Sequence, residues 1–197
     1  FDVNIMGTLN VLDCIRKQPN NPNCVIVTSD KCYQNLELGL PFKEGDPMGG
    51  FDPYSASKGA CELVTESFVT SFFNSPGSSR VASARAGNII GGGDWSQGRI
   101  VTDLVNAASN NENIELRNPA AIRPWQHVLD VVNGYLKLGQ HIDNNKDAFT
   151  AYNFGPPKTH ELNVLDVASS FIKFWGNQNV NVKTPDSSSL PYESKIL

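Results

Sequence analysis

The sequence predicts an α/β protein built on a doubly wound parallel sheet. Short apolar runs alternate along the chain with longer segments whose apolar residues recur at helical spacing. The runs lack the polar alternation of half-exposed strands, which is typical of a parallel sheet covered by helices on both faces. The expected elements become shorter in the second half. We therefore place most of the sheet in residues 1–93 and expect the last sheet strands with a smaller region in 94–197.

The first elements follow directly from this alternation. Apolar residues from Val3 to Ile15 recur at helical spacing, and a cluster of Pro and Asn residues then ends the predicted helix. The apolar run Cys24–Val27 predicts a strand buried on both faces. Residues 34–53 are rich in Gly and Pro and show little periodicity, so we expect a long loop, and such loops are often functional.

The remaining elements continue the same pattern. An amphipathic helix is predicted from Pro53 to Phe73, with Pro53 suited to a helix start. A second buried strand is predicted at Val81–Ala86. Beyond it we expect helices at 101–108, 128–140 and 164–175 and strands at 114–116 and 152–154.

Composition and charge narrow the classes of function. The 197 residues are 40% hydrophobic and 18% charged, as in an ordinary globular protein, and the net charge is -4 with Lys and Arg scattered along the chain. We therefore expect no nucleic acid partner. No apolar stretch approaches the ~20 residues that cross a bilayer, so we expect no membrane partner and a cytoplasmic location. The four cysteines lack metal-ligand spacing, and we expect no metal site.

Both ends of the chain look like cuts in a longer protein. The chain begins at Phe1 without an initiator Met, inside a predicted helix, and it ends at Leu197 with no recognisable stop. We expect an internal piece of a longer protein.

The sharpest local signal is Tyr54-x-x-x-Lys58 on the predicted helix. This spacing puts the phenol and the ammonium one turn apart on the same face. A nearby cation favours the phenolate, so Tyr54 could take a proton from an alcohol while hydride leaves the same carbon. The pattern is weak by itself, because Tyr and Lys also occur at this spacing by chance on helix surfaces.

A second polar group follows the strand Cys24–Val27, where Ser29-Asp30-Lys31 enters the loop. Ligands of α/β sheets bind at the carboxyl ends of the strands. Ser29 could donate a hydrogen bond to a substrate oxygen, Asp30 could act as an acid, and Lys31 could act as a base. The alternative is that these are ordinary polar residues at a strand end.

Together these residues resemble the extended short-chain dehydrogenases/reductases that act on nucleotide sugars. Ser29 with Tyr54 and Lys58 is similar to the Ser/Thr-Tyr-Lys triad of that family. Its sugar 4,6-dehydratases follow the triad Ser or Thr with Asp-Glu. The pair Asp30-Lys31 departs from this and looks like the CDP-glucose 4,6-dehydratase branch, in which Lys takes the Glu position. Three longer strings fit the same branch, and the resemblance covers nearly the whole chain: 46–54, 84–95 and 122–128.

The resemblance implies a partial Rossmann-like fold, with NAD as cofactor contacted by Tyr54 and Lys58. Members of the family hold the dinucleotide on a Gly-rich turn between the first strand and a helix. This chain contains no such turn, because Gly91-Gly92-Gly93 follows a late strand. We expect the adenosine half of NAD to lie on residues outside this chain.

Substrate contacts are also implied by the resemblance, and they give region 94–197 a substrate-binding role. Asn88 corresponds to the family Asn that contacts the sugar-nucleotide diphosphate, and Arg123 corresponds to the Arg that reaches the same group. Arg99 and Asn153 are weaker candidates for substrate contact. For Arg123 the alternative is a structural ion pair.

The implied reaction converts CDP-glucose to CDP-4-keto-6-deoxyglucose by transient oxidation at C4, loss of water and hydride return to C6. A nucleotide-sugar 4-epimerase on the same fold is the main alternative, although it would not need Asp30 and Lys31. The remaining alternatives are a non-catalytic relative and a piece that is inactive by itself. By analogy with the family we expect a homodimer or higher homo-oligomer for the full-length protein.

Overall fold

The computed structural model describes residues 1–144, 149–157, 162–176 and 181–183. By its contacts the chain forms two compact units, and the first consists of Phe1–Gly87 and Val128–Gly155. The second consists of Asn88–His127 and Pro156–Leu197.

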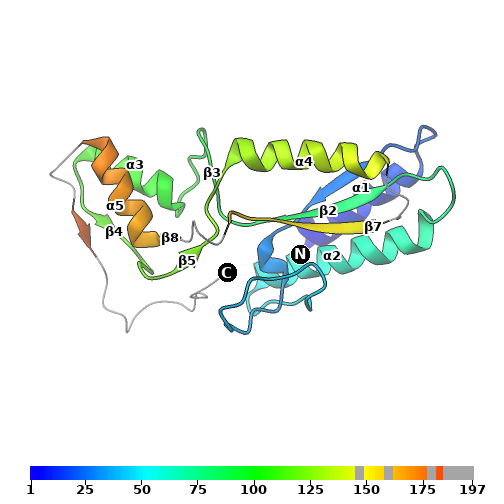
Figure 1. Ribbon diagram of the computed structural model, residues 1–197, viewed down its shortest axis with the longest axis horizontal. Coiled ribbons are helices and arrows are strands. Elements are labelled where there is room, and N and C mark those ends of the chain that lie inside the picture. The colour runs from blue at the N-terminus through cyan, green and yellow to red at the C-terminus, as the bar shows by residue number, and fades with distance from the viewer. Residues whose placement is uncertain (145–148, 158–161, 177–180, 184–197) are drawn as a thin grey trace. The chain divides into compact units, whose positions relative to one another are not determined.

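A three-stranded parallel sheet forms the centre of the first unit, with strand order β1-β2-β7 (Figure 1). The strands are β1 (Cys24–Val27), β2 (Val81–Ala86) and β7 (Phe149–Phe154). Val81 is in register with Cys24 on one side and with Phe149 on the other. The strands predicted at 24–27 and 81–86 are confirmed, and the one predicted at 152–154 is the end of β7.

Helices cover both faces of this sheet, as the doubly wound prediction requires. They are α1 (Gly7–Arg16), α2 (Pro53–Phe72) and α4 (Val128–Asp143). Successive residues of β2 point to opposite faces. Val81 packs into the core formed with α1 and α2, whereas Ala82 and Ala84 pack against α4, which lies on the other side of the sheet from α2 in Figure 1. The polar residues Ser83 and Arg85 share the α2 side with Val81.

The prediction that β1 is buried on both faces is wrong. All residues of β2 are buried, but Val27 at the end of β1 is 50% exposed. The reason is position in the sheet, because β2 has a neighbour on each side whereas β1 pairs only with β2 among the described strands.

The second unit is built around α3 (Ile100–Asn110) and α5 (Val164–Trp175). Leu104, Ile114 and Ala168 form its core, so the two helices pack together over one apolar cluster. All three helices predicted beyond residue 100 are confirmed. The short strands of the unit are β3 (Ile89–Ile90), β4 (Ile114–Glu115), β5 (Ile122–Arg123), β6 (Gln126–His127), β8 (Leu162–Asn163) and β9 (Val182–Lys183).

The chain leaves the first unit after β2 and returns to it with α4 and β7. Residues 128–155 group with the first unit, because β7 pairs with β2. Region 94–197 therefore contains a strand of the main sheet as well as residues of the second unit. Among the described helices none is long and apolar enough to span a membrane.

Candidate active site

The carboxyl end of β1 carries the first group of candidate residues. Thr28 and Ser29 are buried, and a short 3-10 helix, η2 (Asp30–Cys32), follows them. Ser29 caps η2, because its Oγ accepts a hydrogen bond from the backbone N–H of Lys31 at 3.2 Å. The same hydroxyl donates to Asp30 Oδ1 at 3.0 Å. Ser29, Asp30 and Lys31 therefore form one hydrogen-bonded turn at the strand end.

The second group lies on the first turns of α2. Asp52 is the N-cap, and its Oδ1 accepts hydrogen bonds from the N–H groups of Tyr54 and Ser55. The phenol side chain of Tyr54 is reachable from solvent, since the residue is 50% exposed. Lys58 Nζ lies 5.9 Å from the centre of the Tyr54 ring, so the predicted sharing of one helix face is confirmed.

The pKa of the Asp52 carboxyl is influenced by both groups of candidate residues. Burial by itself would raise the pKa of this carboxyl, but the hydrogen bonds from Ser55 and from the N–H of Tyr54 hold the pKa below its ordinary value. The positive charge of Lys31 acts in the same direction. The Lys31 charge on the β1 side is therefore felt at the start of α2.

A glycine allows η2 to lie directly against α2. A Cβ on Gly59 would lie 3.0 Å from the carbonyl oxygen of Cys32 and 3.3 Å from the backbone nitrogen of Gly49. Both distances are tighter than ordinary van der Waals contact. Because Gly59 follows Lys58 in the chain, the close approach brings the Ser29–Asp30–Lys31 turn next to the helix segment that carries Lys58.

The long loop that joins the two groups is closed at its base. Tyr33 forms an antiparallel bridge with Met48, and the N–H of Gly49 donates to the carbonyl of Cys32 at 2.8 Å. The ring of Tyr33 stacks on Phe42 with centroids 4.7 Å apart. The loop predicted at 34–53 therefore leaves η2 and returns beside it just before α2 begins.

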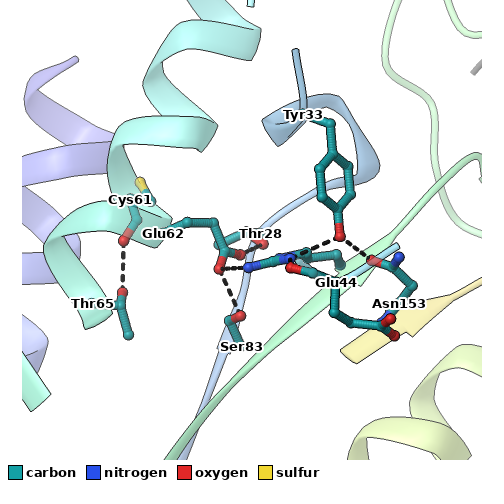
Figure 2. Close-up of polar contacts among 9 residues, drawn as sticks. Thr28, Tyr33, Glu44, Cys61, Glu62, Thr65, Ser83 and Asn153 are labelled. Atoms are coloured by element: carbon teal, nitrogen blue, oxygen red, sulfur yellow. Dashed lines mark hydrogen bonds and ion pairs between the residues drawn. The ribbon is translucent and has the colours of Figure 1, made fainter. Parts of the chain in front are cut away.

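Beneath the two groups lies a buried polar network that the sequence reading did not identify. Glu62 on α2 forms a buried ion pair with Arg85 on β2, with Arg85 Nη2 2.7 Å from Glu62 Oε2. Arg85 Nη1 donates to Tyr33 Oη at 2.7 Å and to the carbonyl of Glu44 at 2.9 Å. Figure 2 shows Glu62 reaching from α2 toward Thr28 and Ser83, with Tyr33 and Asn153 on the far side of the network.

Interactions within this network keep its charged groups ionised although they are buried. Burial opposes the charge of Arg85, but the hydrogen bond and the negative charge of Glu62 raise the pKa of the guanidinium above its ordinary value. Burial raises the pKa of the Tyr33 phenol, although Arg85 opposes this shift. Tyr33 therefore stays protonated and donates to Asn153 Oδ1 at 2.6 Å.

The sequence held a signal for this pair. A charged residue inside a strand predicted to be buried, as Arg85 is, needs an opposite charge nearby. Glu62 lies one helical turn after Lys58 in an otherwise apolar part of the helix. That the two form a pair depends on how α2 packs on β2, which no local pattern specifies.

The expected substrate-binding residues fall in both units. Asn153 lies on β7 in the first unit, and its side-chain amide donates to the carbonyl of Phe42 at 3.1 Å while its oxygen accepts from Tyr33. Asn88, Arg99 and Arg123 belong to the second unit. Asn88 accepts from the N–H of Gln126 through its backbone oxygen, and Arg99 is the N-cap residue of α3. Arg123 is buried on β5, where Nη1 donates to the carbonyl of Ile122.

The fold and the paired residues define a class of protein, a Rossmann-like α/β protein with a Tyr-Lys pair at the start of a helix that packs against the turn after β1. Solved structures share this fold. A dTDP-glucose 4,6-dehydratase from Bacillus anthracis in complex with NAD matches with a TM-score of 0.76 and 20% identity, over 99% of this chain and 58% of that chain. A UDP-glucuronic acid 4-epimerase from Bacillus cereus, in complex with UDP-glucuronic acid and NAD, matches with a TM-score of 0.80 and 15% identity, over 100% of this chain and 58% of that chain.

Sequence comparison gives the family. The chain belongs to the NAD dependent epimerase/dehydratase family, whose model matches residues 1–155. It is 40% identical to the CDP-glucose 4,6-dehydratase of Salmonella typhimurium over 182 residues, which are 90% of this chain and 51% of that protein. It is 27% identical to the dTDP-glucose 4,6-dehydratase of Mycolicibacterium smegmatis over 129 residues, 64% of this chain and 37% of that protein. The chain thus spans about half the length of the first of these relatives.

The residues present fit the reactive half of the family's cofactor, NAD. Tyr54 offers an exposed phenol, and Lys58 places an ammonium on the same helix face. Both groups can hydrogen-bond hydroxyls of a ribose and of a substrate. They lie at the start of α2, which contacts the turn after β1, and α/β proteins bind nucleotides outside the carboxyl ends of their strands.

Proposed function

We propose that the protein containing this chain is a nucleotide-sugar 4,6-dehydratase that converts CDP-glucose to CDP-4-keto-6-deoxyglucose. One observation carries the proposal: the Ser29–Asp30–Lys31 turn packs through Gly59 against the helix that bears Tyr54 and Lys58. Two sets of proton-transfer groups are therefore available near the carboxyl end of β1. The identity of 40% to a CDP-glucose 4,6-dehydratase supports the choice of substrate.

The first set of groups serves oxidation at C4. Tyr54 takes the proton of the 4-hydroxyl, and Ser29 hydrogen-bonds the same oxygen. The ammonium of Lys58 stabilises the phenolate that Tyr54 needs for this role. NAD, held beside Tyr54 and Lys58, would supply the acceptor for the C4 hydride and the donor of the hydride to C6.

The second set serves the loss of water. The 4-ketone acidifies the C5 proton, and Lys31, once deprotonated, removes it. Asp30 gives a proton to the departing 6-hydroxyl, which leaves as water. After the hydride returns to C6, Lys31 gives its proton back to C5. The proton that Tyr54 took from the 4-hydroxyl passes through solvent to Asp30, so both groups return to their starting forms. Lys58 and Lys31 thus have separate roles, one electrostatic and one in proton transfer.

We further propose that Asn88 and Arg123 bind the diphosphate of the substrate, with Arg99 and Asn153 as additional contacts. A guanidinium binds phosphate oxygens through two parallel hydrogen bonds, which suits Arg123. Asn153 would have to share its amide with Tyr33 and Phe42, its partners within the chain. Assembly as a homodimer and a cytoplasmic location remain predictions.

The fold and the Tyr-Lys pair also favour a second candidate, a nucleotide-sugar 4-epimerase. Solved 4-epimerases share the fold of this chain. Epimerisation at C4 requires Tyr54 and Lys58 but has no use for an acid and a base for water loss. The pair Asp30-Lys31 therefore distinguishes the two reactions and favours dehydration.

The deciding experiment gives the full-length protein CDP-glucose and dTDP-glucose with NAD and follows the 4-keto product by its absorbance in alkali. Product from CDP-glucose alone supports the proposal. Epimerised sugar without water loss would move the function to the 4-epimerases. No reaction with either sugar, from a folded protein that binds NAD, would contradict both.

A further inference from the structure

The carboxylate of Glu62 gathers three hydrogen-bond donors from two strands. Its Oε1 accepts from Thr28 Oγ1, at the carboxyl end of β1. Its Oε2 accepts from Ser83 Oγ and from Arg85 Nη2, both at 2.7 Å and both on β2. Glu62 is 2% exposed, so these bonds are shielded from bulk solvent. Figure 2 shows this carboxylate between Thr28 and Ser83.

The same residue occupies the helix face that carries the proposed chemistry. Tyr54, Lys58 and Glu62 are spaced at i, i+4 and i+8 on α2, so they follow one another along one face. Thr28 directly precedes Ser29. A single buried carboxylate therefore joins the face of Tyr54 and Lys58 to the strand end that presents Ser29.

We infer that Glu62 is a positioning residue, which fixes the rotation of α2 so that Tyr54 and Lys58 meet the Ser29–Asp30–Lys31 turn. The inference rests on the proposed function. Apolar packing resists separation of two elements but is not directional. Hydrogen bonds to three fixed donors specify orientation as well, and chemistry is sensitive to shifts on the order of 1 Å.

Arg85 links the long loop between η2 and α2 to the same network. It neutralises Glu62 within the buried site and donates to Tyr33 and to the carbonyl of Glu44. Burying an ion pair is seldom the most stable solution for a core. Its presence here, where a directional contact links helix, strand and loop, is explained by positioning better than by stability.

The test removes one hydrogen bond and leaves the ion pair intact. Thr28→Val in the full-length protein deletes the donor to Glu62 Oε1 with little change of volume. Thr65→Val is the matched control, because Thr65 is buried like Thr28 but lies farther along α2, and its hydroxyl donates to the carbonyl of Cys61 one turn earlier. Thr28→Ser restores the hydroxyl. Each variant is measured for kcat and KM with CDP-glucose and for amide hydrogen exchange of residues 29–33.

For Thr28→Val we expect kcat to fall about tenfold with KM within about twofold, because the lost contact affects geometry during reaction and not substrate affinity. We expect amide exchange of residues 29–33 to speed up about tenfold, as loss of one hydrogen bond to a charged group would cause. Thr28→Ser should regain most of both. Thr65→Val should change neither.

Three results would overturn the inference. In the first, Thr28→Val behaves like Thr65→Val in both measurements. In the second, amide exchange of residues 29–33 speeds up while kcat stays the same, which would show that the contact has a purely structural role. A lower kcat without faster exchange would show an effect that does not pass through this contact. If the wild-type protein turns over no nucleotide sugar, the proposed function fails separately. Unchanged amide exchange in Thr28→Val would then be enough to reject the positioning role of the Thr28–Glu62 hydrogen bond.

A second variant, Glu62→Gln, keeps one acceptor oxygen and should reproduce the kcat loss of Thr28→Val.

Discussion

The carbonyl oxygen of Cys32 approaches the backbone of Gly59 so closely that a Cβ on Gly59 would lie 3.0 Å away. A methyl group there would push η2 away from α2 by a few tenths of an ångström. We expect Gly59→Ala to lower kcat about tenfold, because catalysis depends on positions at this scale. Alanine also favours the helix by ~0.5–1 kcal/mol, so the free energy of unfolding should change little.

Gly7→Ala is the control for this substitution. Gly7 begins α1, and a Cβ there would meet nothing within 4 Å. This variant should be more stable by ~0.5–1 kcal/mol with unchanged kinetics. Wild-type kcat in Gly59→Ala would show that the close approach has no part in catalysis.

Tyr54→Phe removes the proposed base for C4 oxidation. We expect kcat to fall by a factor of ~10²–10⁴, the usual contribution of a positioned general base. Tyr135→Phe is the matched control, because the Tyr135 hydroxyl is buried and lacks a hydrogen-bond partner within the described structure. That control should keep full activity and gain up to ~1 kcal/mol of stability, measured by urea unfolding. Full activity in Tyr54→Phe would reject Tyr54 as the base.

Lys31→Ala separates the two halves of the proposed reaction. The oxidation at C4 relies on Tyr54 and Lys58, so the variant should still transfer hydride, seen as reduced nicotinamide absorbance after CDP-glucose is added. The loss of water should slow by a factor of ~10² or more. Water loss at an unchanged rate would exclude Lys31 as the C5 base.

The burial of Cys32 predicts a low thiol reactivity that depends on pH. Burial raises the pKa of Cys32 to about 12, although the charge of Arg85 opposes the shift. The thiolate is the reactive form, so labelling of Cys32 by iodoacetamide should stay slow until the pH approaches this value. Cys14 is exposed and should be labelled at pH 8, as followed by mass spectrometry of peptides. Equal labelling of both residues in the folded protein would contradict this.

Arg85→Met tests the energy of the buried ion pair. Glu62 would keep a buried charge without its partner, so unfolding should become easier by ~3–5 kcal/mol. Arg16→Met is the comparison, because the Arg16–Asp13 pair lies at the surface, with side chains 41% and 33% exposed. That change should leave the free energy of unfolding close to the wild-type value. Similar losses in both variants would mean that burial adds nothing to the contribution of Arg85.

Most of the fold was predictable because its elements are long enough to show a period. The strand at 81–86 and the helix starting at Pro53 were recognised from apolar spacing and a helix-start residue. The described strands of the second unit each span two residues. The strand predicted at 114–116 is confirmed as β4, but the others, such as Ile89–Ile90, were not predicted, because no period can be seen over that length. The exposure of Val27 depends on which strands flank β1, which is a property of the whole sheet.

The site was predictable only where spacing along the chain determines position in space. Tyr54 and Lys58 share a face because helix geometry requires it at i, i+4. The pairing of Glu62 with Arg85 joins residues 23 apart in sequence, and only the packing of α2 on β2 brings them together. Likewise, the sequence gives no sign that Gly59 lies against Cys32, so it cannot be distinguished there from any other helical glycine.

The closed base of the long loop has an evolutionary consequence. Tyr33 and Met48 bridge, so the segment between them departs from the proposed catalytic residues and comes back to the same point. Lengthening a surface loop adds little entropic cost once its ends are fixed. Insertions or deletions among residues 35–41 would therefore leave Ser29 and Tyr54 in place. Sequence and length are therefore expected to vary more in this segment than in the residues that flank it.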